Sequence, residues 1–306
     1  MTFMSAVPSD KIQGVLVASI TPRRSTEVTI DFGAALELID FFHDHKVDGI
    51  ALLGSTGEFP HFSMEDRARL AVMAAKRSRV PVLVNASHST LEGSVSLARD
   101  AIDAGVAGVL LMPPYYYRYD QESIRAYCLE FAEQVKAPAY LYNIPFFTNE
   151  LQIQTSLDLL ASGAFAGIKD SSGKWEEFAA LQKLAAEREI SVFVGSDVMY
   201  SRARAAGAAG AVSGLASAVP ELMVAIERRV RSGRDTKVLD AHLNDFADRV
   251  LSFPLPIAIR EAVAIRGIKT GPHAIPLAPA DSRRLSEFGS WFRAWLPSVT
   301  AACKSV

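Results

Sequence analysis

The sequence predicts a (β/α)8 barrel, the TIM barrel of the α/β class, followed by a C-terminal helical extension. Short apolar segments alternate with amphipathic helical patterns eight times within about 220 residues, as the strands and helices of such a barrel do. The segments are apolar throughout, which is typical of parallel strands that are covered on both faces. Neither a GxGxxG turn nor a GxxxxGK[ST] loop occurs, and a glycine-rich turn of that kind would favour a doubly wound sheet.

The eight expected strands are brief and rich in Val, Ile, Leu or aromatic residues. They span residues 14–20, 49–54, 81–86, 107–112, 138–143, 165–169, 191–195 and 210–214.

The segments between the strands carry apolar residues three and four positions apart, the spacing of an amphipathic helix. Asp31 and Ser63 precede the first two patterns as N-caps, and Asp66 makes the second start close to a capping box. Gly105 is a typical helix stop, and the fourth pattern ends before Pro138, which restricts the residue that precedes it. The expected helices span about 32–45, 64–77, 90–105, 121–135, 150–161, 174–187, 198–206 and 218–231.

The barrel is expected to occupy residues 1–231, and residues 232–306 are expected to form a helical extension packed on it. Three further helical patterns fall at 235–251, 255–268 and 279–296. No linker separates them from the barrel, and barrel folds of this length commonly remain one unit.

Composition and charge exclude several function classes. The net charge of the 306 residues is −2 with no block of like charges, so nucleic acid and membrane surfaces are poor partners. No apolar run approaches the ~20 residues of a membrane-spanning helix, and residues 1–11 do not resemble a signal peptide. Cys128 and Cys303 lie far apart without CxxC spacing, which favours a reducing, cytoplasmic location.

Polar residues gather where the expected strands end, which is where barrel enzymes place their active sites. Lys169, after the sixth strand, is the only lysine among these strand ends. One lysine after an apolar strand is usually a solvated strand end, so the prediction depends on its polar neighbours. Apolar surroundings disfavour the charged ammonium, and a neutral amine can form a Schiff base with a ketone.

The neighbouring strand ends supply groups that Schiff-base chemistry needs. Tyr142 ends the fifth strand and could shuttle protons between substrate and amine. A hydroxyl of Ser55 or Thr56 could link it to a second tyrosine, for which Tyr116 is the candidate. Together with the backbone N–H of Gly57, these hydroxyls could also hold a carboxylate beside the ketone.

Other chemistries find less support. The six histidines form no HxxxH or HExxH pair and no GxSxG elbow occurs, so neither a metal site nor a serine triad is expected. His61 and His88 fall in loops at the catalytic end, where they could contact a polar substrate tail. Asp170 is best explained as a cap of the helix that follows. No organic cofactor is expected.

The motifs GSTGE, PPYYYR, YNIP, GIKDSSG, GSD and GAAGAVSG together resemble the dihydrodipicolinate synthase and N-acetylneuraminate lyase family. These enzymes are class I, pyruvate-dependent aldolases, and the resemblance covers nearly the whole chain. It implies that Lys169 forms the Schiff base, that Tyr142 is the general acid and base, and that Ser55 and Thr56 bind the pyruvyl carboxylate.

The resemblance also implies an assembly. Tyr116 resembles a relay tyrosine that many members contribute across a subunit interface, within a homotetramer built as a dimer of dimers. Gly195 and the carbonyl of Val212 match positions that line the substrate site. The implied partner is a small molecule, pyruvate or another 2-keto acid together with an aldehyde.

One position departs from the dihydrodipicolinate synthase branch. That branch has an arginine two residues after the proline of YNxP, where it receives the carboxylate of the aldehyde partner. Here Phe147 follows Pro145 at that distance, and a phenyl ring cannot make the bidentate contact of an arginine. A 2-keto-3-deoxy sugar acid or a similar 4-hydroxy-2-keto acid is therefore the expected substrate, although Arg118 or a histidine could supply a charge.

Three alternatives stay open at this point. One is a dihydrodipicolinate synthase (4-hydroxy-tetrahydrodipicolinate synthase) with a rebuilt carboxylate site. Another is a sugar acid dehydratase that uses the same lysine. The least favoured is a non-catalytic protein that binds a keto acid.

Overall fold

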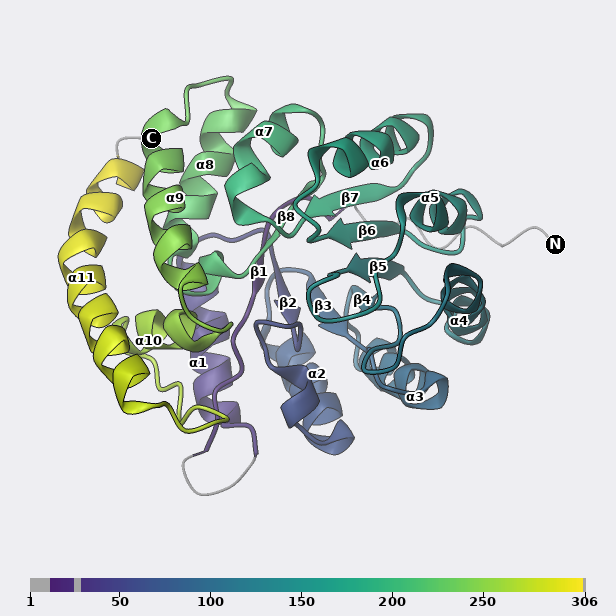
Figure 1. Ribbon diagram of the computed structural model, residues 1–306, viewed down its shortest axis with the longest axis horizontal. Helices are drawn as coiled ribbons and strands as arrows, with labels where there is room; N and C mark the ends of the chain where they lie inside the picture. Colours follow the sequence, from purple (N-terminus) through teal and green to yellow (C-terminus); the bar gives the residue numbers. More distant parts are fainter. Residues whose placement is uncertain (1–11, 25–28, 305–306) are drawn as a thin grey trace.

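The computed structural model describes residues 12–24 and 29–304 and shows a closed barrel of eight parallel strands (Figure 1). Each strand pairs with the next in the chain, and β1 closes the ring on β8. The predicted (β/α)8 fold is confirmed, while residues 1–11, in which no signal peptide is expected, lie outside the described residues. The strands are β1 (Gly14–Ala18), β2 (Gly49–Leu52), β3 (Val82–Asn85), β4 (Gly108–Leu111), β5 (Ala139–Asn143), β6 (Gly167–Asp170), β7 (Ser191–Val194) and β8 (Gly210–Ser213).

Helices follow the strands as the alternating pattern predicts. Asp31 accepts a hydrogen bond from the backbone N–H of Ala34, and Ser63 accepts one from that of Asp66, so both N-caps are confirmed. The helix expected over 198–206 divides into a 3-10 turn and a short α-helix. The helices of the barrel are α1 (Phe32–Asp44), α2 (Met64–Arg77), α3 (Leu91–Asp103), α4 (Gln121–Gln134), α5 (Ile153–Ala161), α6 (Trp175–Glu187), α7 (Tyr200–Ala205) and α8 (Pro220–Arg231), with 3-10 turns η1 (Phe59–His61), η2 (Asp197–Met199) and η3 (Leu215–Ser217).

Asp170 belongs to strand β6 and does not cap the next helix, so that expectation is wrong. Its carboxylate accepts hydrogen bonds from Asn143 Nδ2 at 2.8 Å and from Ser172 Oγ at 2.7 Å. Helix α6 begins at Trp175 without a side-chain cap. Register explains the difference, because Asp170 pairs with Asn143 of β5 and the ladder therefore continues one residue past Lys169.

Three further helices, α9 (Lys237–Leu251), α10 (Ile257–Ile265) and α11 (Pro279–Lys304), contact one another, and α9 and α11 also contact α8 (Figure 1). Aromatic rings of α9 and α11 stack between them, with Phe246 against Trp295 at a centroid distance of 5.3 Å. Helix α11 continues through Pro297 to Lys304, past the end expected at residue 296. The buried side chain of Val299 shows why, since packing of the last turns offsets the cost of the proline.

The C-terminal helices lie near the mouth of the barrel. In Figure 1 the arrowheads of β5, β6 and β7 point toward the side where α9 and α10 lie. Contacts of α9 with η2 and of α10 with η3 fix this placement, since both turns follow barrel strands. Within the described ranges, no helix has the length and apolarity needed to cross a membrane.

Candidate active site

Lys169 and Tyr142 lie side by side on neighbouring strands. The register of β5 and β6 pairs them directly, and Lys169 Nζ is 4.0 Å from the centroid of the Tyr142 ring. Both side chains are almost wholly buried, with exposed fractions of 5% and 2%. The barrel thus encloses an amine and a phenol within reach of one small substrate.

A hydroxyl of the loop after β2 continues this pair. Tyr142 Oη and Ser55 Oγ are 3.2 Å apart, a hydrogen bond in which either oxygen can donate. Thr56, next in the chain, also lines the site. A proton can therefore be exchanged between the phenol of Tyr142 in β5 and the hydroxyl of Ser55 in the loop after β2.

The loop that carries Ser55 and Thr56 is a strained turn. Leu53 and Glu58 flank it with φ angles of 59° and 52°, and non-glycine residues in this left-handed region cost about 1–3 kcal/mol each. Asn85 holds the Leu53 end by donating from Nδ2 to its carbonyl at 2.8 Å. Arg260 of α10 holds the other end, with Nη1 2.9 Å from Glu58 Oε2.

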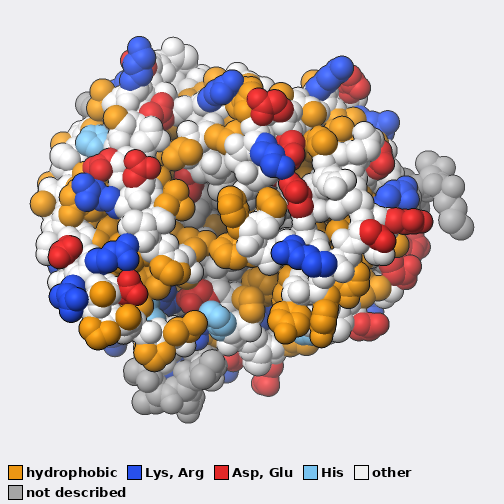
Figure 2. All heavy atoms as spheres, in the orientation of Figure 1, with side chains coloured by type: hydrophobic (Ala, Val, Ile, Leu, Met, Phe, Trp, Pro, Cys, Tyr) orange, Lys and Arg blue, Asp and Glu red, His pale blue; other side chains and the backbone are white. Residues whose placement is uncertain are grey.

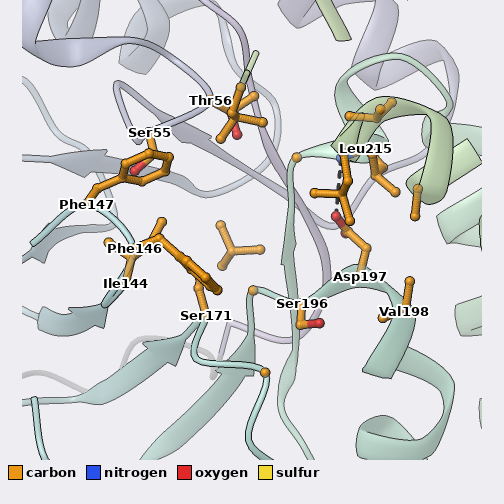
Figure 3. A pocket seen from close by; sticks show the side chains of 18 of the residues that line it. Ser55, Thr56, Ile144, Phe146, Phe147, Ser171, Ser196, Asp197, Val198 and Leu215 are labelled. Atoms are coloured by element: carbon orange, nitrogen blue, oxygen red, sulfur yellow. Dashed lines mark hydrogen bonds between the residues drawn. The ribbon is translucent and has the colours of Figure 1, made fainter. Parts of the chain in front are cut away.

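A cavity of about 610 Å³, part of which Figure 3 shows, opens at the ends of the strands and is lined by Lys169. Figure 2 shows a hollow near the middle of the viewed face, with hydrophobic side chains around it. Seven of the residues singled out in the sequence line this cavity: Ser55, Thr56, Tyr142, Phe147, Lys169, Gly195 and Val212.

Gly57 and Tyr116 are not among the residues that line it. A Cβ at Gly57 would come 3.0 Å from the Ser19 carbonyl oxygen and from the backbone of Leu53, so close packing of the turn explains this glycine. Tyr116 is 86% exposed, adopts φ of 77° and packs edge-on against Tyr117. Within a single chain, Tyr116 therefore does not join the group around Lys169.

The three candidates for a charged contact to the substrate lie elsewhere. His61 Nδ1 is 2.6 Å from Arg23 Nη2, and His88 contacts Thr90 on the surface. Arg118 is exposed, with Nη1 3.4 Å from the Thr148 carbonyl. None of the three lines the cavity.

Gly195 leaves the room that Lys169 needs. A Cβ at this position would overlap Ser171 Oγ and lie 3.0 Å from Lys169 Cε. The glycine that follows β7 is therefore required by the close approach of Ser171 and of the lysine stem, a role that its motif GSD did not reveal.

Asp197 is a site residue that the sequence reasoning did not select, although its motif was noted. Its Oδ2 accepts from the backbone N–H of Leu215 at 3.5 Å, and its buried Oδ1 has no partner among the described residues. Burial raises the pKa of Asp197 to about 6, while hydrogen bonds from Ser213 and Leu215 and the charge of Lys169 act in the opposite direction. Figure 3 shows it across the cavity from Phe146 and Phe147.

Six residues of the C-terminal segment line the cavity, and the sequence pattern did not identify them. We call these six residues the C-terminal wall: Ala247, Val250, Leu251, Phe253, Leu255 and Ile259. Apolar positions of a helix look alike in sequence whether they face a core or a cavity, which is why the pattern could not reveal them.

Among the residues that the structure describes, no group of three or more His, Cys, Asp or Glu side chains is arranged to hold a metal ion. The polar groups around Lys169 are hydroxyls and one carboxyl, which suit proton transfer.

An eight-stranded barrel with a buried lysine and tyrosine on adjacent strands, both lining a cavity at the strand ends, has the architecture of a barrel enzyme. The model of the dihydrodipicolinate synthetase family matches residues 11–294, so the chain belongs to that family. The chain is accordingly a carbon–carbon lyase that acts on small molecules, as the pyruvate-dependent members of this family are.

Individual relatives agree with this assignment. The chain is 34% identical over 258 residues to an uncharacterized DapA-like lyase of Chloroflexus aurantiacus, covering 82% of this chain and 86% of the relative. It is 28% identical to a 4-hydroxy-tetrahydrodipicolinate synthase of Oceanobacillus iheyensis, with coverage of 90% and 95%. A solved 2-keto 3-deoxygluconate aldolase from Picrophilus torridus superposes with a TM-score of 0.79 at 25% identity, covering 87% of this chain and 99% of that one.

Proposed function

We propose that Lys169 forms a Schiff base with the ketone of pyruvate or another 2-keto acid, and that the enzyme makes or breaks a carbon–carbon bond to an aldehyde. The observation that carries this proposal is the buried pair of Lys169 Nζ and the Tyr142 ring, 4.0 Å apart, with Tyr142 hydrogen-bonded to Ser55. The amine attacks the ketone carbon, and the ketone oxygen leaves as water with a proton from Tyr142, which gives a cationic iminium and leaves Tyr142 as the phenolate that can accept a proton in the next step.

In the cleavage direction Tyr142 takes the proton of the C4 hydroxyl. The electrons of the O–H bond form the aldehyde carbonyl, and those of the C3–C4 bond move toward the iminium to give an enamine. Protonation of C3 and hydrolysis then release pyruvate and return the free amine of Lys169. Condensation follows the same steps in reverse.

The remaining cavity residues position the keto acid. Ser55 and Thr56 hold its carboxylate, helped by the backbone N–H of Gly57. Gly195 and the carbonyl of Val212 line the space beside Lys169, which is supported by their place in the cavity wall. The expected substrate is a 4-hydroxy-2-keto acid, of which a 2-keto-3-deoxy sugar acid is one kind.

A homotetramer, arranged as a dimer of dimers, would complete the proton relay. An exposed tyrosine with φ of 77° costs about 1–3 kcal/mol, and such strain persists only where surroundings or function retain it. Tyr116 would reach the relay of a second subunit, beside Ser55 or Thr56. Sedimentation velocity tests the assembly.

The proposed location is a reducing compartment such as the cytoplasm, which is supported by the two free cysteines, Cys128 and Cys303.

Borohydride reduction in the presence of pyruvate tests the central step. Intact mass and peptide mapping should locate the reduced adduct on Lys169, and Lys169→Ala should abolish both adduct and turnover. Absence of an adduct from the wild-type protein would refute the proposed chemistry. A dehydratase would also give the adduct, but it would release a new keto acid instead of an aldehyde.

A further inference from the structure

The C-terminal wall lines the same cavity as Lys169 and is apolar at each of its six positions. The segment after strand β5 adds a second apolar group to the lining, Ile144, Phe146 and Phe147 (Figure 3). Polar side chains also line the cavity, namely Ser55, Thr56, Tyr142, Lys169, Ser171, Ser172, Ser196 and Asp197, but none of them belongs to either of these two apolar groups.

These two apolar groups are exposed to water at the mouth. Phe146 and Phe147 from the segment after β5, and Leu251 and Leu255 from the C-terminal wall, belong to the exposed large apolar side chains of the described chain. Apolar area that a ligand removes from water favours binding roughly in proportion to that area. Hydrophobic side chains grouped around a hollow, as in Figure 2, are typical of a binding site.

Charges in the cavity are few. Among the lining residues that the structure describes, Lys169 is the only cation and Asp197 the only anion. A second carboxylate on the substrate would need a cation other than the lysine already committed to the Schiff base.

A polyhydroxylated tail fits the same space poorly. Each hydroxyl that leaves water needs a hydrogen-bond partner, and the C-terminal wall offers no polar side chain. The hydroxyl of Ser172 already donates to Asp170 at 2.7 Å. Ser171, Ser196 and Asp197 remain as the side chains that could meet the hydroxyls of such a tail.

We propose that the C-terminal wall binds an aldehyde with an aromatic or branched aliphatic body, so that the substrate is a 4-hydroxy-2-keto acid with an apolar group on C4. This inference rests on the proposed Schiff-base function and narrows its substrate class. The enamine carbon of pyruvate bonds to the aldehyde carbon, the aldehyde oxygen takes a proton from Tyr142, and hydrolysis frees the product from Lys169.

The size of the cavity suits such a partner. Its volume of about 610 Å³ lies within the range of roughly 300–1,000 Å³ that is typical of sites for ligands much larger than pyruvate. An aromatic ring that contacts Phe147 and the C-terminal wall would remove apolar area from water, and a contact between two rings adds to the gain from burial.

Pyruvate condensation with three aldehydes tests the proposal: benzaldehyde, D-glyceraldehyde and aspartate semialdehyde. Borohydride trapping of pyruvate on Lys169 is measured first, without any aldehyde. We expect an adduct, and a kcat/KM for benzaldehyde at least about tenfold above the other two, as burial of one ring predicts. An adduct with a preference for either polar aldehyde overturns the proposal alone, whereas no adduct overturns the Schiff-base function as well.

Two variants of helix α9 provide a matched comparison. Leu251→Asn changes an exposed residue of the C-terminal wall, and Val238→Asn changes an exposed apolar residue of the same helix outside the cavity. We expect Leu251→Asn to lower kcat/KM for benzaldehyde about fivefold to tenfold while borohydride trapping with pyruvate stays unchanged. Val238→Asn should leave both unchanged. Equal activity of the two variants with benzaldehyde would contradict a role of the wall in binding the aldehyde.

Discussion

Replacing Asp197 by Asn removes a titrating group from the cavity while nearly keeping its shape. Burial raises the pKa of Asp197 from an ordinary 3.8 to about 6. The folded protein thus keeps a proton that the unfolded chain loses when the pH rises above about 4. The variant has no such proton, so the difference between the two proteins isolates this carboxyl.

The sign and size of the effect follow from the two pKa values. Because the folded-state value is the higher one, the free energy of unfolding of the wild type falls relative to Asp197→Asn as the pH rises from about 4 to about 6. Each pKa unit corresponds to about 1.4 kcal/mol, so the full difference approaches about 3 kcal/mol above pH 6. The buried carboxyl of Asp170 also has a raised pKa, but it is common to both proteins and cancels.

Urea unfolding of both proteins at intervals from pH 4 to pH 7.5 measures this difference. Asp103→Asn, at an exposed position of helix α3, is the control and should show no such trend. A constant difference between the wild type and Asp197→Asn across this range would refute the reasoning. If the wild type instead became more stable relative to Asp197→Asn as the pH rises, the pKa of Asp197 would be lowered in the folded protein and not raised.

Three further substitutions probe the site and its support. Tyr142→Phe should lower kcat by about 10²–10⁴-fold, measured by steady-state turnover, yet still allow borohydride trapping on Lys169, because only the proton shuttle is lost. Phe147→Arg should create activity with aspartate semialdehyde, read in a coupled assay, since a guanidinium would face the substrate's second carboxylate; no gain would argue against this position as the specificity site. Arg260→Met should lower the free energy of unfolding, measured with urea, by about 3–5 kcal/mol, because it leaves the buried Glu58 without its ion-pair partner at 2.9 Å. Little change would show that the second ion pair of Glu58, with Arg23, is enough to compensate its buried charge.

Strand order made the central pair predictable. Tyr142 and Lys169 close consecutive apolar segments, and consecutive parallel strands of a barrel are neighbours, so their side chains had to meet at one end. The ends of the strands were harder to predict than their order, because apolar residues continue in the sequence beyond the last residue that pairs with a neighbouring strand. Asp170 was predicted to cap a helix because it is a polar residue just after the apolar segment. Its pairing with Asn143 instead places it inside strand β6, so here the strand extends further than predicted.

Other features had no local signal. Tyr116 carries an aromatic motif, but its position outside the cavity depends on a loop whose conformation the motif does not determine. Helix α11 continues past Pro297 because the tertiary packing of Val299 outweighs the tendency of proline to end a helix. The C-terminal wall required the tertiary structure, since only that reveals which apolar helix positions face an opening.

The C-terminal wall has a consequence for how such an enzyme can diversify. The reacting groups come from residues 55–169, whereas the wall comes from residues 247–259, a separate stretch of chain. Substitutions in the later stretch can change the accepted partner without disturbing Lys169, Tyr142 or Ser55. Selection can therefore act on reactivity and on substrate choice independently, and a mutational library confined to residues 247–259 would sample new partners on an unchanged catalytic centre.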